Sequence, residues 1–174
     1  MADRQRAGLL VSAAAGDEVA FHRIIAAYHD DMRRVATYIA RDKALAEEAT
    51  QAAWIIAWKR IGDVRDEANL RPWLMAVAAN EAKRVLRKRR RRAEIEVSTD
   101  ASGEPGGIDP ATGVAAMDLR AALDRLDPDD RALLAMRYVA GLDSNELATA
   151  TGISPSGTRN RLERLRNRLR QELE

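Results

Sequence analysis

The sequence predicts an all-α protein made of two small helical units. Its 174 residues are rich in Ala, Leu, Arg and Glu, which favour helices, and only 4% are aromatic. Along most of the chain, apolar side chains recur every three or four residues, which is the helical period. The segment 93–113 interrupts this pattern, and its four glycines, two prolines and five acids predict a flexible acidic linker. We therefore expect helical units at 1–92 and 114–174.

Three helices are predicted in the first unit. The second begins after Asp42 and can pack on two sides, because Trp54 and Trp58 lie beside its apolar face. The stretch 62–71 breaks the helical pattern and predicts a loop. Pro72 suits the first turn of the third helix, where its missing N–H costs nothing. The first helix is long and amphipathic, with an apolar stripe of Phe21, Ile24, Ile25, Tyr28, Met32, Val35 and Ile39.

The second unit carries clear start and stop signals for four helices. Asp127 caps a helix that begins with proline and acids and stops at Gly141. Asp143 and Glu146 form a capping-box-like pair for a short helix, which Gly152 ends. The four helices are expected at 114–126, at 128–139, from Asp143 to Thr151, and from Pro155 after the cap Ser154.

The last two of these helices fit a helix-turn-helix. Such a motif needs two short helices at a steep angle, a tight turn that usually contains glycine, and a small residue where the helices touch. Leu147, Ala148, Gly152 and Ile153 meet these needs. One side of the final helix should be buried, and its stripe consists of Thr158, Leu162, Leu165, Leu169 and Leu173.

Candidate DNA contacts lie at the start of the final helix. The N-terminal residues of a recognition helix face base edges, and the side opposite the buried stripe is centred on Ser156, Asn160 and Arg164. An arginine-rich terminal helix can also be a solvated surface, but the preceding cap, turn and helix favour DNA reading. The predicted contacts are Ser156, Thr158, Arg159, Asn160, Arg161 and Arg164, with Arg161 nearer the phosphates.

A dense basic block ends the first unit. Eight of the ten residues between Lys83 and Arg92 are Lys or Arg, and they continue the third helix. Cations at this density bind phosphates without reading sequence, and such binding weakens steeply with salt. A charge run alone is most often a solvated tail, but a second DNA-facing element in the same chain favours the nucleic-acid role.

Three motifs, in order and over almost the whole chain, resemble the extracytoplasmic-function (ECF) sigma factors, the small initiation subunits of bacterial RNA polymerase. They are the segments 46–51 (AEEATQ), 71–80 (RPWLMAVAAN) and 154–169 (SPSGTRNRLERLRNRL). The chain departs from the family where Ala52-Ala53-Trp54 replaces acid-Thr-Phe, where Arg84 replaces a polar amide, and where Thr158 replaces an apolar residue. With these departures polymerase binding is still expected, whereas the promoter sequence does not follow from the motifs.

The resemblance implies partners and residue roles. The first unit is expected to dock on the clamp helices of the largest polymerase subunit through Glu47, Glu48 and Gln51. The loop at 62–71 is expected to capture a base flipped out of the minus-ten element. The melted minus-ten region is assigned to Asn80, Lys83, Arg84, Arg87 and Lys88.

The resemblance also implies that the second unit reads the minus-thirty-five element. Two units that each bind DNA weakly then bind it tightly together, because the linker gives the second unit a high effective concentration once the first is bound. The acidic linker is expected to thread the transcript-exit path of the polymerase. An anti-sigma partner is also expected, clamping both units.

Other classes of protein fit less well. The chain has no cysteine, no glycine-rich phosphate loop and no catalytic triad pattern, and His22 and His29 lie about 10 Å apart, too far to share a metal. We expect no enzyme activity, metal or cofactor. No apolar stretch reaches the roughly 20 residues of a membrane span, so a cytoplasmic protein is expected. The alternatives are a stand-alone dimeric helix-turn-helix regulator and an adaptor that binds no DNA.

Overall fold

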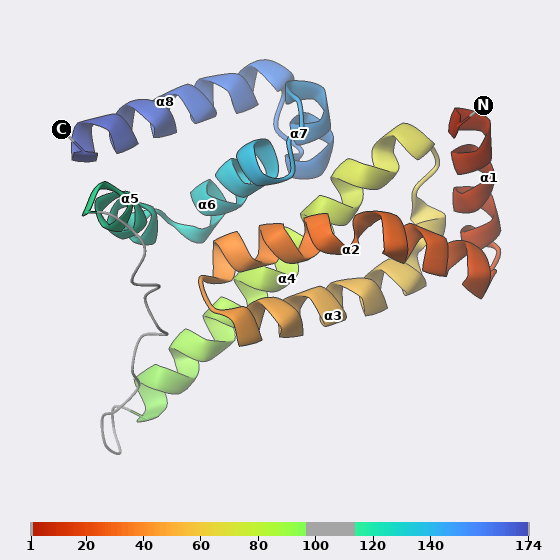
Figure 1. The fold of residues 1–174 in the computed structure, drawn as a ribbon, viewed down its shortest axis with the longest axis horizontal. Coiled ribbons are helices and arrows are strands. Elements are labelled where there is room, and N and C mark those ends of the chain that lie inside the picture. Colours follow the sequence, from red (N-terminus) through yellow and green to blue (C-terminus); the bar gives the residue numbers. More distant parts are fainter. Residues whose placement is uncertain (1, 97–113, 174) are drawn as a thin grey trace.

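The computed structural model describes residues 2–96 and 114–173, and side chains are described from Gly8 to Ile95, at Leu119 and from 121 to 173. The described residues form eight α-helices and no strand (Figure 1). The helices are α1 (Ala2–Ala14), α2 (Glu18–Ala40), α3 (Lys43–Arg60), α4 (Glu67–Glu96), α5 (Val114–Arg125), α6 (Pro128–Leu134), α7 (Ser144–Thr151) and α8 (Pro155–Leu173). Two short turns complete them: the 3-10 turn η1 (Ile61–Asp63) and the π-helical turn η2 (Ala135–Val139).

The N-terminal unit is a bundle of α1 to α4 in which α2, α3 and α4 pack against one another. Its core includes Met32, Ile39 and Leu74, whose side chains are fully buried. As predicted, α3 packs on two neighbours, with Asp42 as its N-cap. The sequence did not predict α1, which packs on α2 through Leu10 and Ala13, both buried. Among the described helices, none is long and apolar enough to cross a membrane.

Helix α4 differs from the prediction at both ends. It begins at Glu67 rather than at Pro72, with the Asp66 side chain accepting the Ala68 N–H at 3.0 Å. Pro72 is buried as the sixth residue of the helix, so it removes one backbone hydrogen bond near an end where free N–H groups already occur. At its other end the helix continues to Glu96, so 93–96 are helical rather than linker. The rest of the predicted linker, 97–113, lies outside the described residues.

The C-terminal unit confirms the predicted start and stop signals. Asp127 caps α6, and Asp143 with Glu146 forms a complete capping box at the start of α7. Gly152 ends α7 with a φ of 72°, a left-handed conformation that suits glycine. Ser154 Oγ accepts the Gly157 N–H at 3.1 Å and so caps α8. The predicted helix 128–139 is divided: its second half is the π-helical turn η2.

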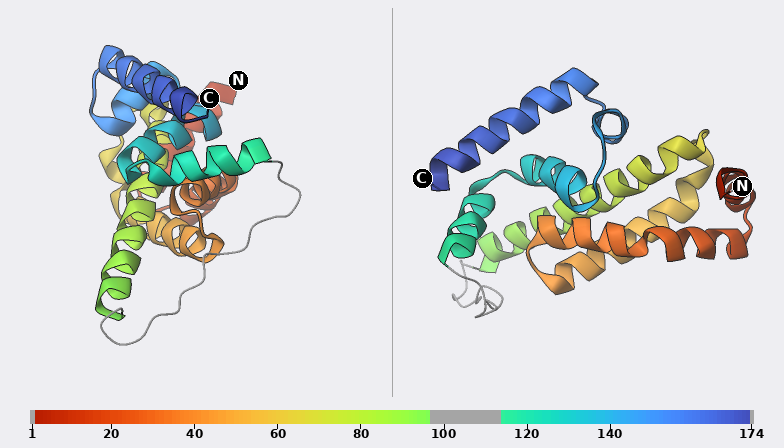
Figure 2. Two further views of the ribbon diagram at one scale, coloured as in Figure 1. Left: turned by 90° about the vertical axis from the view of Figure 1, so that its left-hand side faces the viewer. Right: turned by 45° about the horizontal axis from the view of Figure 1, so that its top comes forward.

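The two units pack on each other in this structure. Figure 2 shows α5 to α8 lying along one side of the α2–α4 bundle. Helix α6 and the turn η2 contact α2, while α7 contacts α4. The buried apolar residues of both units form one continuous cluster. That the units at 1–92 and 114–174 fold separately stays a prediction.

The carboxylate caps make the helices of the C-terminal unit sensitive to acid. The N–H groups of Glu146 and Asn145 hold the pKa of Asp143 below its ordinary value of 3.8. A lowered folded-state pKa stabilises the fold above pH 3.8, and this contribution is lost as the pH falls through the folded-state pKa. We expect the urea midpoint of the wild type to fall between about pH 5 and about pH 3. Asp143→Asn retains a capping oxygen that does not titrate, so its midpoint should fall less; an equal fall in both proteins would contradict this role.

Candidate nucleic-acid interface

The start of α8 presents an exposed polar surface. Ser156, Arg159, Asn160 and Arg164 are exposed, as expected for the side opposite the buried stripe. Leu162 and Leu165 are buried against the rest of the C-terminal unit, and α8 packs on α5, α6 and α7. The helix is therefore held by one side and leaves four candidate DNA contacts in solvent.

Two of the six predicted contacts of α8 differ from this picture. Thr158 is fully buried, and its Oγ1 donates to the carbonyl of Pro155 at 2.9 Å, so it belongs to the packing side and its prediction as a DNA contact is wrong. Arg161, one turn away on the edge of the buried stripe, is half-buried. Its Nη2 lies 2.6 Å from Asp130 of α6, so it is engaged within the protein. Leu173, predicted to be buried, is 43% exposed.

The basic part of α4 forms a second polar surface. Arg84, Arg87 and Lys88 are exposed and line a hollow of about 450 Å³ together with Arg91, Arg92 and Ile95. Arg84 also pairs with Glu81 at 2.6 Å, and Lys88 lies 3.8 Å from Glu48 of α3. These pairs are at least half-exposed on the basic side, so they cost little to exchange for phosphates.

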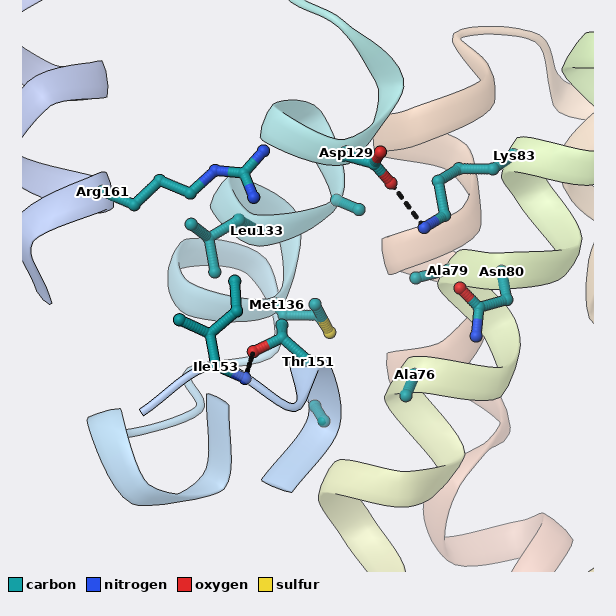
Figure 3. Close-up of a pocket in the computed structure, with 12 residues that line it drawn as sticks. Ala76, Ala79, Asn80, Lys83, Asp129, Leu133, Met136, Thr151, Ile153 and Arg161 are labelled. Atoms are coloured by element: carbon teal, nitrogen blue, oxygen red, sulfur yellow. Dashed lines mark hydrogen bonds and ion pairs between the residues drawn. The ribbon is translucent and has the colours of Figure 1, made fainter. Parts of the chain in front are cut away.

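Asn80 lies one helical turn before Lys83 and faces two hollows. The first, of about 510 Å³, is lined by Asn69, Trp73 and Arg65, which come from the predicted base-capture loop and the start of α4. The second, of about 300 Å³, lies between α4 and the C-terminal unit (Figure 3). In it Lys83 reaches across to Asp129 at 2.7 Å.

Helix α3 presents an exposed face of a different character. Glu47, Glu48 and Gln51 are exposed, as predicted. The same face continues at steps of four and three residues to Ile55, 59% exposed, and Trp58, 38% exposed. Trp58 was predicted to lie beside the apolar face of this helix and to pack on a neighbour. Its ring does pack edge-on against Phe21, with centroids 4.8 Å apart, but it also reaches solvent. The sequence did contain a signal for Ile55: it is an apolar residue one helical turn after Gln51, and therefore on the same face.

One of the two histidines is engaged between helices. The Nε1 of Trp54 donates to Nδ1 of His29 at 3.2 Å, which ties α3 to α2. Within residues 2–96 and 114–173, no group of three or more His, Cys, Asp or Glu side chains is placed to hold a metal ion.

Both units match family models of the same kind. Residues 24–92 match "Sigma-70 region 2", and residues 116–169 match "Sigma-70, region 4". The first match covers most of the N-terminal bundle, including the exposed face of α3 and the basic part of α4. The second covers α6 and α7 and most of α5 and α8.

Several curated proteins are similar to the chain over most of its length. A probable RNA polymerase sigma factor, RfaY of Xanthomonas campestris, is 32% identical over 94% of the chain, which corresponds to 43% of RfaY. The chain thus spans less than half of that relative. The RNA polymerase sigma factor CarQ of Myxococcus xanthus is 30% identical, covering 91% of each protein. The ECF RNA polymerase sigma factor SigL of Mycobacterium tuberculosis is 33% identical over 87% of the chain and 88% of SigL.

Two solved structures share the fold. CnrH in complex with the cytosolic domain of CnrY gives a TM-score of 0.68 at 23% identity, covering 95% of this chain and 94% of that one. The sigma factor RpoE of Bartonella quintana, in complex with the anti-sigma factor NepR, gives 0.68 at 22% identity, covering 88% and 96%.

Proposed function

Because the chain belongs to the ECF sigma factors, we propose that it binds core RNA polymerase through α3 and reads promoter DNA through α4 and α8. Proteins of this family direct the polymerase to promoters and start transcription, and they do no covalent chemistry themselves. The observation that supports the proposal best is that each matched unit leaves a polar or cationic helix face in solvent. Relatives that act on RNA polymerase also favour a cytoplasmic protein.

The face of α3 suits a protein partner. It combines two acids and an amide with exposed apolar side chains at Ile55 and Trp58. Protein interfaces commonly place such apolar anchors at their centre and polar groups at the rim. We assign this face, with Glu47, Glu48 and Gln51, to the clamp helices of the largest polymerase subunit.

The hollow of about 510 Å³ suits a nucleobase. Trp73 offers a ring for stacking, while Asn69 and Asn80 offer amides that can pair with a base edge. Extruding a base costs a few kcal/mol, which a fitting pocket and a captured single strand offset. We assign this hollow to the flipped base of the minus-ten element, and Lys83, Arg84, Arg87 and Lys88 to phosphates of the melted strand.

Helix α8 is assigned to the minus-thirty-five element in the major groove. The proposed contacts are Ser156, Arg159, Asn160 and Arg164. Arg161 joins them only if it leaves Asp130. An anti-sigma partner is proposed because the RpoE and CnrH structures hold the named partners NepR and CnrY.

In vitro transcription tests the function as a whole. Core RNA polymerase is incubated with genomic templates, with and without the chain, and the transcript starts are mapped. New starts that need the chain are expected. A chain that adds none would refute the assignment, and a stand-alone regulator would instead bind duplex DNA tightly as a dimer without polymerase.

The basic part of α4 should contribute phosphate contacts rather than sequence reading. Arg91 lines the same hollow as Arg87, so we assign it to phosphates as well. Arg87→Ala and Arg91→Ala together should weaken promoter binding of the holoenzyme on every template alike. The slope of log K against log salt should shrink by about 0.7 to 0.9 for each phosphate that is no longer neutralised. The slope is measured by anisotropy between about 0.05 and about 0.3 M NaCl. An unchanged slope would remove these residues from the DNA-binding set.

A further inference from the structure

A glycine lies in the first turn of α8 at a position where a larger residue would not fit. A Cβ atom at Gly157 would lie 2.7 Å from Cγ2 of Ile153 and 3.1 Å from Oγ of Ser154. Non-bonded carbon atoms in proteins make their best contacts at about 3.5 to 4.0 Å. The space that a methyl group would need at this position is therefore already occupied by the turn between α7 and α8.

Ile153 is held in place by both its side chain and its backbone. Its Cγ2 is attached directly to Cβ, and a β-branched side chain has few favourable χ1 angles, so Cγ2 moves only with the whole side chain or with the backbone. The side chain lines the hollow of about 300 Å³ together with Leu133 and Met136, as Figure 3 shows. The N–H of Ile153 donates to Oγ1 of Thr151 at 3.3 Å. A shift of Cγ2 therefore disturbs these contacts.

Ser154, the other neighbour of this position, is the cap of α8. Its Oγ accepts the Gly157 N–H at 3.1 Å and lies 3.2 Å from Oγ of Ser156. Its carbonyl accepts the N–H of Thr158 at 2.9 Å, which begins the helical hydrogen bonding of α8. A residue with a Cβ at position 157 would push against this cap or against Ile153. Either shift changes the direction in which α8 leaves the turn.

The proposed base contacts lie next to Gly157 in the first turns of α8. Ser156 precedes it, and Arg159 and Asn160 follow it. The part of α8 that follows is anchored by the buried side chains of Leu162 and Leu165 and by Arg161, whose Nη2 lies 2.6 Å from Asp130. A displacement that starts at Gly157 therefore acts on the base contacts first.

We propose that Gly157 is a positioning residue for promoter reading. Its missing side chain lets Ile153 lie against the first turn of α8, and this contact fixes the direction in which the helix presents its proposed base contacts to the minus-thirty-five element. The inference rests on the proposed function, because it takes Ser156, Arg159 and Asn160 as base contacts.

Gly157→Ala in the holoenzyme tests the proposal. The template is a promoter mapped in the transcription experiment above, used intact and with a scrambled minus-thirty-five element. Loss of a single base contact lowers discrimination by about five-fold or more, so the preference for the intact template should fall by at least about that factor. Both templates receive the same holoenzyme, so a lower yield of folded protein does not change the preference. A preference equal to that of the wild type would overturn the proposal.

Gly157→Ala combined with Ile153→Leu tests whether the effect depends on Ile153. Leucine has as many carbon atoms as isoleucine, but its branch lies at Cγ, so it has no methyl group in the place of Cγ2. The double variant should regain most of the template preference, with Ile153→Leu alone as its baseline. A double variant that is no better than Gly157→Ala would overturn the proposal, because the crowding would not involve Ile153.

Gly8→Ala is the matched control. Gly8 is exposed and also lies in a helix, α1, but a Cβ there would point into open space. Alanine favours helices over glycine, so Gly8→Ala should unfold at a higher temperature than the wild type and keep its template preference. Gly157→Ala should unfold at a lower temperature, because its methyl group is crowded. A gain in stability equal to that of Gly8→Ala would overturn the crowding on which the proposal depends.

The wild type separates a failure of this inference from a failure of the proposed function. New transcript starts with a clear preference for the intact template support promoter reading by α8. If Gly157→Ala then shows the same preference, only the positioning role fails. A wild type without any template preference would refute the assignment of α8 to the minus-thirty-five element, and the positioning role with it.

Discussion

Ile55→Asp is expected to weaken binding to core RNA polymerase by about 30-fold or more. The side chain is 59% exposed at the middle of the α3 face, between Gln51 and Trp58. A central apolar anchor of an interface commonly contributes about 2 kcal/mol or more, and a buried carboxylate in its place adds a desolvation cost. Because the residue is exposed in the free chain, the substitution should leave the fold intact.

The affinity for core polymerase is measured by anisotropy of the labelled chain, with thermal unfolding as a check of the fold. Val11→Asp is the matched control, since Val11 is 71% exposed and lies on α1 rather than on α3. Ile55→Leu should retain most of the affinity. Equal affinities for Ile55→Asp and Val11→Asp would show that the polymerase binds elsewhere.

Arg159→Ala and Asn160→Ala should each reduce initiation that depends on the minus-thirty-five element by about 5- to 150-fold. Both side chains are exposed in the first turns of α8, where an arginine or an amide can pair with a base edge at about 1 to 3 kcal/mol per contact. The measurement is the ratio of transcripts from an intact template and from one with a scrambled minus-thirty-five element. This ratio should approach one in each variant.

Arg170→Ala is the control for that experiment. It lies ten residues beyond Asn160, about 15 Å along the same helix, and is exposed in its last turn. Its removal should leave the template ratio unchanged, even if overall binding weakens. A ratio that falls equally in all three variants would contradict the assignment of base reading to the start of α8.

The sequence predicted local structure well where single residues decide it. Asp42, Asp127 and Asp143 cap helices because a short acceptor fits the free N–H groups, and Gly152 ends α7 because a left-handed residue is needed there. The fold class and the family followed from such signals together with the three motifs. Helix α1 was not predicted, because its short apolar stripe shows no clear helical period.

Features that depend on contacts between distant segments were not predicted. An arginine in an otherwise ordinary helix start is expected to face solvent, yet Arg131 is buried against α2 because the two units pack together. Thr158 suits either side of a helix, and only its neighbours decide that it is buried. The exposure of Ile55 likewise follows from how α3 lies between α2 and α4.

The uninterrupted course of α4 has a mechanical consequence. Its 30 residues make a rod of about 45 Å, anchored in the core at Leu74 and Val85. Asn80 and Arg91 therefore keep a fixed separation of about 16 Å, close to the span of five nucleotides along one strand. The helical rise therefore fixes the spacing between a base bound at Asn80 and the phosphates bound further along α4. Two glycines inserted between these positions would make that spacing variable without removing any charge.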